Sequence, residues 1–288
     1  MLWFVLAILA ALAVTGRDVS LKALFTTEKP LEIAALELFW SLPAFVIATL
    51  LTPMPPFTGD FWATFLVSLP LEIVPYILYL YAIRISPLTL TVPFLAFTPV
   101  FMILTGRLIL GETISLWGGL GIAAVTAGSY ILHLEKGSKG WWSPFFGFFR
   151  EKGSWLMFLV AILYSLGAVV GKKAMLLSSP LYFSFLFSAV FNALILFGLL
   201  AGGAVDRRML FRERKKGLWL AFLLIAAAIF HALAIMQTAA VYMIAVKRSS
   251  ILFGVLGGWL ILKEENRGWR GLGSLCMFCG VLLITLLG

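Results

Sequence analysis

The chain has 288 residues, of which 62% are hydrophobic and only 12% are charged. So few polar side chains cannot cover a soluble globule of this size, and composition therefore excludes a water-soluble protein. The net charge of +9 would suggest nucleic-acid binding in a soluble protein, but most of the 22 Lys and Arg residues fall between apolar segments. This distribution is typical of positive-inside bias, so we expect the lipid bilayer as the surroundings and no nucleic-acid partner.

A helix that crosses the hydrocarbon core needs about 20 mostly apolar residues. Ten segments come close to this length: 2–24, 32–52, 61–83, 88–110, 116–134, 154–175, 181–203, 217–243, 247–263 and 268–287. Their continuous apolar runs disfavour a transmembrane β-barrel. No Lys or Arg precedes the first run, so we read it as a retained helix and not as a signal peptide. We predict an all-α membrane protein with ten transmembrane helices.

Basic residues gather on one side of these segments. Most lie near the ends of the first, third, fifth, seventh and ninth segments, and six lie between positions 207 and 216 alone. Loops rich in Lys and Arg stay in the cytoplasm. We therefore predict a multi-pass protein of a prokaryotic cell membrane, with both termini outside.

The fourth and ninth segments end in related motifs, Leu-Gly-Glu at 110–112 and Leu-Lys-Glu at 262–264. The same offset separates three pairs of residues, namely Glu112 and Glu264, Trp117 and Trp269, and Gly119 and Gly271. Duplication is the simplest explanation, and we expect these repeated residues to be structural.

Five helices in each copy is an odd number, so the second copy enters the membrane in the opposite direction. We predict inverted repeats at residues 1–134 and 154–288. Residues 135–153 combine aromatic and basic side chains, which is typical of a linker at the membrane interface.

The ten segments, the duplicated motif, Pro99 before Glu112 and the glycine-rich fifth and tenth segments together resemble an EamA-type member of the drug/metabolite transporter superfamily. The second copy departs from the first, with Lys263 and Ile251 in place of Gly111 and Pro99. The resemblance implies a carrier for small metabolites, often an exporter, whose cavity is lined mainly by helices 1, 3, 4, 6, 8 and 9.

Glu72 is the outstanding candidate for a substrate- or proton-binding residue. It lies near the middle of the third segment between Pro70 and Pro75. Charged groups in hydrocarbon cost about 2.5 to 3.5 kcal/mol each, so they persist mainly where they face protein or water. Tyr76 and Tyr79 follow at helical spacing on the same face. This face could bind a proton or an amine, or it could be a structural carboxyl group with packed tyrosines.

Other polar residues lie within apolar runs. His231 and Gln237 could line the same pocket, although an intramembrane histidine is often satisfied by a neighbour. Asn192 suits helix–helix hydrogen bonding. Glu37 suits an interfacial ion pair, and Lys247 either attracts an anion or extends to the interface.

We therefore predict a secondary transporter that moves an amino acid, an amine or a similar metabolite by alternating access. A lipid flippase or scramblase is the main alternative. An enzyme is disfavoured because the two histidines are far apart and no metal-ligand or nucleophile motif occurs. We expect no cofactor and no metal. The glycine-rich fifth and tenth segments could pack within one subunit or in a homodimer.

Overall fold

The computed structural model describes residues 1–25, 28–86, 91–132, 151–203, 205–260 and 269–288. Its helices are α1 (Leu2–Leu24), α2 (Pro30–Leu51), α3 (Gly59–Ile85), the 3₁₀ helix η1 (Val92–Phe97), α5 (Thr98–Leu110), α6 (Leu116–Leu132), α8 (Lys152–Leu176), α9 (Pro180–Ala201), α10 (Arg207–Arg212), α11 (Arg214–Ile235), α12 (Ala240–Lys247), α13 (Ser249–Leu260) and α14 (Trp269–Leu287). Seven stretches of this described chain are helical, long and apolar enough to span a membrane, and shorter apolar helices accompany them. The all-α prediction is confirmed for the described residues, which contain no strand.

Local capping explains where several helices begin and end. The Thr58 side chain accepts a hydrogen bond from the Phe61 N–H at 3.3 Å, and Ser179 accepts one from the Tyr182 N–H at 3.2 Å. At the end of α5, Gly111 has a φ of 68°, a left-handed conformation that glycine adopts readily. The Leu-Gly-Glu motif is therefore a helix stop.

The predicted eighth and ninth segments, 217–243 and 247–263, have the wrong boundary. The helix breaks at 236–239, and the ninth span consists of α12 and α13 with Arg248 between them. A break in an apolar bundle must find partners for its freed backbone groups. Here the Ala240 N–H donates to the Glu112 carboxylate at 2.9 Å, and the Lys172 ammonium donates to the Thr238 carbonyl at 2.5 Å. Both partners are remote in sequence, so the local pattern did not reveal the break.

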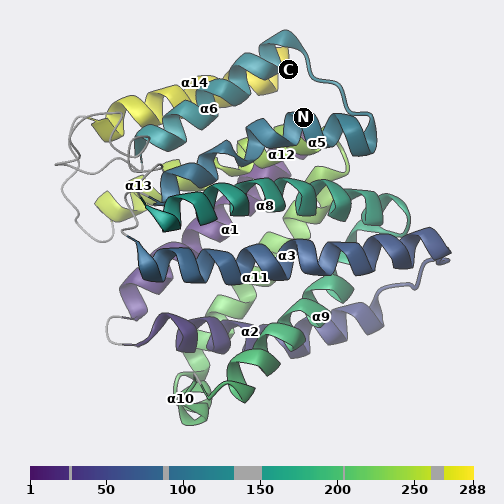
Figure 1. Cartoon of the computed structure of the whole chain (residues 1–288), viewed down its shortest axis with the longest axis vertical. Helices are drawn as coiled ribbons and strands as arrows, with labels where there is room; N and C mark the ends of the chain where they lie inside the picture. Colours follow the sequence, from purple (N-terminus) through teal and green to yellow (C-terminus); the bar gives the residue numbers. More distant parts are fainter. Residues whose placement is uncertain (26–27, 87–90, 133–150, 204, 261–268) are drawn as a thin grey trace.

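Most helices from the first half of the chain pack against helices from the second half (Figure 1). Helix α1 packs against α11, and α3 packs against α8. Helix α5 contacts α8, and α13 contacts α1. Helix α2 pairs with α9, whereas α6 pairs with α14 in an outer layer at the top of Figure 1. Segments from the beginning and the end of the chain thus form one bundle.

The contact between α6 and α14 depends on glycine. A Cβ atom at Gly128 would lie 2.6 Å from the Gly273 carbonyl oxygen, and one at Gly121 would lie 2.8 Å from the Gly280 carbonyl oxygen. Any larger residue would therefore push the backbones apart. Gly119 is not part of this contact, because its Cβ would meet only the Ile114 side chain.

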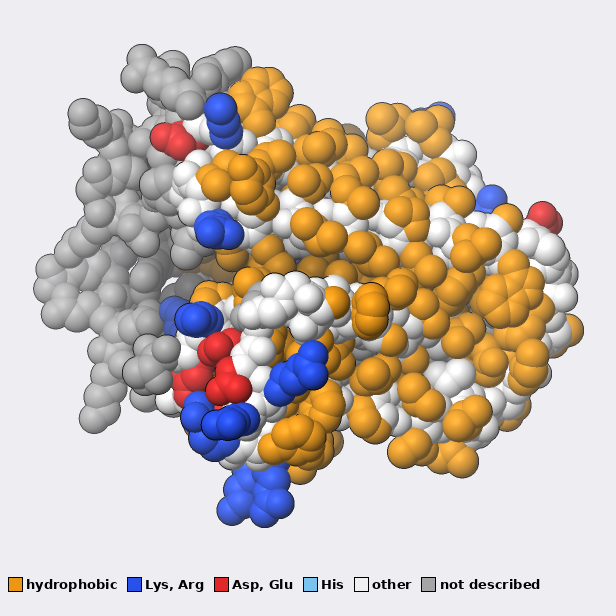
Figure 2. All heavy atoms as spheres, turned by 60° about the horizontal axis from the view of Figure 1, so that its bottom comes forward, with side chains coloured by type: hydrophobic (Ala, Val, Ile, Leu, Met, Phe, Trp, Pro, Cys, Tyr) orange, Lys and Arg blue, Asp and Glu red, His pale blue; other side chains and the backbone are white. Residues whose placement is uncertain are grey.

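The exterior of the bundle is apolar over most of the face in Figure 2, and Lys and Arg side chains gather toward one end. Exposed basic residues at α10 and the start of α11 include Arg207, Arg208, Arg212, Arg214 and Lys215. Beside them, Phe211 is 63% exposed. Basic residues beside an exposed aromatic ring suit the headgroup region of a bilayer. Glu264 and most of the predicted linker 135–153 lie outside the described residues.

Candidate functional site

A cavity of about 420 Å³ lies inside the bundle. It is lined by residues of α1, α2, α3, α8, α9, α11 and α12. The resemblance implied helix 4 as a lining helix, but no described residue of η1 or α5 lines the cavity. These two elements pack against α8, and α8, the predicted sixth helix, lines the cavity as the resemblance implied, with Gly167, Gly171 and Lys172. The second and seventh spans, α2 and α9, line it as well.

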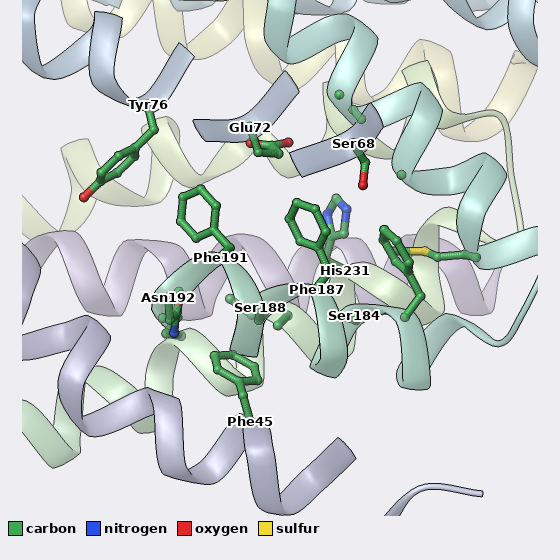
Figure 3. Close-up of a pocket in the computed structure, with 18 of the residues that line it drawn as sticks. Phe45, Ser68, Glu72, Tyr76, Ser184, Phe187, Ser188, Phe191, Asn192 and His231 are labelled. Atoms are coloured by element: carbon green, nitrogen blue, oxygen red, sulfur yellow. The ribbon is translucent and has the colours of Figure 1, made fainter. Parts of the chain in front are cut away.

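Helix α3 supplies Ser68, Glu72 and Tyr76, which are spaced one turn apart. Figure 3 shows Glu72 between the other two along the helix. Glu72 takes part in no hydrogen bond and no salt bridge with any residue that the structure describes. One of its carboxylate oxygens lies against α8, where a Cβ atom at Gly167 would be 3.0 Å away. The absence of a side chain at Gly167 therefore leaves room for this carboxylate.

Helix α9 supplies an alternating polar and aromatic face. Ser184, Phe187, Ser188 and Phe191 line the cavity at helical spacing, and Figure 3 shows these two phenylalanine rings near Glu72. The rings are stacked, with centroids 6.2 Å apart and an interplanar angle of 17°. This wall can accommodate an apolar group and still offer hydroxyls.

Asn192 ties α9 to α2, as its sequence context predicted. Its Nδ2 donates to the Ser41 hydroxyl at 2.9 Å, and both residues are buried. The Ser41 hydroxyl in turn donates to the Glu37 carbonyl at 2.7 Å. These bonds satisfy the polar groups at one edge of the cavity.

Arg17 and Glu37 form a two-point ion pair. Arg17 Nε lies 2.5 Å from one Glu37 oxygen and Nη2 lies 2.7 Å from the other. The pairing predicted for Glu37 is confirmed, but Glu37 is only 4% exposed. Nη1 of Arg17 also lies 3.2 Å from an oxygen of its sequence neighbour Asp18. The half-buried guanidinium thus contacts two carboxylates.

On the α8 wall, the charge of Lys172 is compensated by a salt bridge to Glu112. Its ammonium lies 2.5 Å from Oε1 of Glu112, whose other oxygen caps α12 at Ala240. Glu112 therefore has the structural surroundings expected of the repeated motif. Trp117, in the same motif, lies near the start of α6 and is half exposed.

Lys247 enters the cavity because the ninth span is broken. It is the last residue of α12, and its Nζ lies 3.2 Å from Nδ1 of His231. The sequence pattern predicted Lys247 at the start of a span, where its side chain would attract an anion or extend to the interface. In the structure it lines the cavity together with Glu72. The adjacent Arg248 reaches the other way and donates to the Leu95 carbonyl at 3.2 Å.

The predicted site residues separate into two groups. Glu72, Tyr76 and His231 all line the cavity. Tyr79 packs near Met157 on α8, and Gln237 is exposed and donates to the Leu233 carbonyl at 3.0 Å. Arg17 and Lys172 also line the cavity, and they were not predicted as site residues because their positions depend on pairing between helices.

The described residues contain no group of three or more His, Cys, Asp or Glu side chains that could hold a metal ion. The cavity instead offers carboxylate, ammonium, imidazole, hydroxyl and aromatic groups. Such a set can bind a small polar or amphipathic solute by charge pairing, hydrogen bonding and ring contact.

Long apolar helices around a cavity with charged walls define a multi-pass helical membrane protein with an internal polar site. The sequence profile of the EamA-like transporter family matches residues 1–134. The chain thus contains an EamA-like transporter family domain over residues 1–134. Proteins of this family are typically not enzymes.

A solved structure described as "Crystal structure of protein" has a TM-score of 0.73 to this chain and 12% sequence identity. The similarity covers 100% of this chain and 98% of the other. At this identity the likeness establishes a shared fold. No curated protein matches the sequence.

Proposed function

We propose that the protein is a secondary transporter that moves a small metabolite, such as an amino acid or an amine, by alternating access. Export is the direction that the family resemblance favours. The observation that carries the proposal is Glu72, a carboxylate without a hydrogen bond or salt bridge among the described residues, in the wall of a cavity of about 420 Å³. An unpaired charge inside a membrane bundle is costly, so it indicates a ligand or a proton.

The same proposal includes ten transmembrane helices arranged as inverted repeats, residues 1–134 and 154–288, joined by the linker 135–153. The helix contacts support it. If α1, α2, α3, α5 and α6 correspond to α8, α9, α11, α13 and α14, then α1–α11 corresponds to α8–α3, and α1–α13 corresponds to α8–α5. The pairs α2–α9 and α6–α14 correspond to themselves. A two-fold relation accounts for all of these contacts.

The cavity draws its walls from both proposed repeats. Glu72 belongs to the first, whereas His231 and Lys247 belong to the second. Tilting one repeat against the other would therefore open the cavity to each side of the membrane in turn. Glu72 would hold a proton or a substrate cation at the centre, and Tyr76 and His231 would shape the pocket.

The basic cluster at α10 and the start of α11 supports a cytoplasmic location for that end. Figure 1 marks both termini away from α10. We therefore keep the termini outside in this proposal.

Flux into proteoliposomes tests the function. Purified protein is reconstituted, and uptake of radiolabelled amino acids and amines is measured with and without a pH gradient. Flux should be saturable and should fall at least about tenfold in Glu72→Gln, because a charge pair at this site is worth at least the 1.4 kcal/mol that corresponds to tenfold.

Asp60→Asn is the matched control. Asp60 is an exposed carboxylate in the first turn of the same helix, so its loss should leave flux unchanged. Unaltered transport in Glu72→Gln would remove this residue from the mechanism. Translocation of fluorescent phospholipids without solute flux would favour the flippase alternative.

A further inference from the structure

We infer that the cavity binds a zwitterion, with Glu72 as the ligand of its ammonium group and Lys247 as the ligand of its carboxylate. This inference rests on the proposed transport function and selects among its substrate classes. Its basis is the balance of charge in the cavity after the internal ion pairs are taken into account.

Most cavity charges are compensated within the protein. The Arg17 guanidinium pairs with Glu37 through two contacts, and the Lys172 ammonium pairs with Glu112. Among the described lining residues this leaves Glu72 and Lys247, neither of which forms a salt bridge. The lining thus presents one carboxylate and one ammonium whose charges interact across the cavity but are not paired in a salt bridge.

These two groups face one cavity from opposite parts of the chain. Glu72 projects from α3, and Lys247 projects from the end of α12. Their charges interact, but no salt bridge joins them among the described residues, and in our proposal the ligand lies between them. A ligand with both charges would compensate both groups at once.

His231 gives the Lys247 side of the cavity a second donor. An ammonium can only donate, so Nδ1 of His231 accepts the contact with Lys247 at 3.2 Å. The imidazole then carries its proton on Nε2. Both residues line the cavity, so in our proposal Lys247 and the Nε2–H of His231 each donate to one oxygen of the carboxylate.

The wall of the cavity that α9 forms favours a ligand that is partly apolar. Phe187 and Phe191 stack beside Glu72, with Ser184 and Ser188 on the same face of α9 (Figure 3). Cavities of a few hundred cubic ångströms are typical of small-molecule sites. An amino acid with an apolar side chain can therefore present its charged groups to Glu72 and Lys247 and its side chain to the rings.

Ligands with a single charge fit less well for electrostatic reasons. A simple amine would pair with Glu72 but would leave Lys247 uncompensated and would add a like charge near it. A simple carboxylate would pair with Lys247 but would leave Glu72 uncompensated. Selectivity for a zwitterion thus comes from repulsion as well as attraction.

A matched set of three solutes tests the inference. Leucine carries both charges, isoamylamine lacks the carboxylate, and 4-methylpentanoate lacks the ammonium. Competition with the flux of a radiolabelled zwitterion, or of whichever solute the reconstituted protein moves, gives an apparent affinity for each. The wild-type protein should prefer leucine to both single-charge analogues by at least about tenfold, the equivalent of one ion pair.

The two variants should change selectivity in opposite directions. Lys247→Gln should weaken leucine and 4-methylpentanoate but not isoamylamine, whereas Glu72→Gln should weaken leucine and isoamylamine but not 4-methylpentanoate. Lys247→Arg keeps the charge and should retain the preference for leucine. Thermal shifts with the same three solutes give a readout that does not require flux.

The experiments distinguish failure of the zwitterion inference from failure of the proposed transport function. Equal affinity for leucine and isoamylamine, unchanged by Lys247→Gln in folded protein, would overturn the zwitterion inference and leave the transporter intact. No flux and no thermal shift with any amino acid or amine, in protein whose Asp60→Asn control is equally well folded, would overturn both the inference and the proposed function.

Discussion

The Glu112 carboxylate lies 2.5 Å from the Lys172 ammonium and joins the end of α5 to the middle of the bundle. The same carboxylate caps α12 at Ala240, and the same ammonium holds the Thr238 carbonyl. One buried pair therefore connects α5, α8 and the break before α12. Lys247 lies at the other end of that short helix, so this pair also helps to place a cation in the cavity.

Glu112→Gln should destabilise the protein strongly. It would leave the Lys172 ammonium buried without its counter-charge, which typically costs about 3 to 5 kcal/mol. Thermal unfolding in detergent measures the loss, and the double variant with Lys172→Met should recover part of it. The surface pair of Arg212 and Glu213, whose arginine side chain is 65% exposed, provides the control, because Arg212→Gln should change stability by less than about 1 kcal/mol. Equal effects at both pairs would contradict a central role for Glu112.

Gly128→Ala should separate α6 from α14. The new Cβ atom would lie 2.6 Å from the Gly273 carbonyl oxygen, so the backbones must shift, and overpacking of this kind typically costs about 1 to 3 kcal/mol. Gly119→Ala on the same helix meets only a side chain at 3.6 Å and should be neutral or slightly stabilising. Melting temperatures of the two variants should therefore move apart, and a common small shift would show that the close contact is unimportant.

Gly167→Ala should weaken substrate binding and should also lower stability, because its Cβ atom would lie 3.0 Å from the Leu71 carbonyl oxygen on α3. The added methyl group would lie 3.0 Å from the Glu72 carboxylate and would crowd the position at which an ammonium is bound in our proposal. Gly171→Ala lies one turn further along α8 and would meet only Phe183 at 3.8 Å, so it should cause a smaller fall. Dose-dependent thermal shifts with leucine compare the two. A larger loss at Gly171 would place the ligand elsewhere in the cavity.

The orientation of the chain can be tested with single cysteines. Cys276 and Cys279 are free and are first replaced with serine. Asp206→Cys, beside the basic cluster, should be shielded from an impermeant thiol reagent in intact cells and should react after permeabilisation. Ser178→Cys, between α8 and α9, should show the opposite pattern. Labelling of both positions from the same side would contradict the proposed topology.

Much of the architecture was readable from local sequence. The first predicted segment coincides with α1, and most other segments differ from the observed helices by only a few residues, because apolar length alone decides whether a segment can span a bilayer. Glu72 was identifiable for a similar reason. A carboxylate near the middle of an apolar run is costly in lipid, wherever the other helices lie.

The remainder of the site depended on contacts between distant parts of the chain. Residues 236–239 contain no proline or glycine, and the helix break there is stabilised by Glu112 and Lys172. That break moves Lys247 from the predicted start of a span into the cavity, and packing decides that Tyr76 lines the cavity whereas Tyr79 does not. Sequence determined which segments enter the membrane, since burial in lipid is a property of each segment. Tertiary structure decided which charges are compensated and which remain available, since pairing requires residues that meet only in the folded bundle.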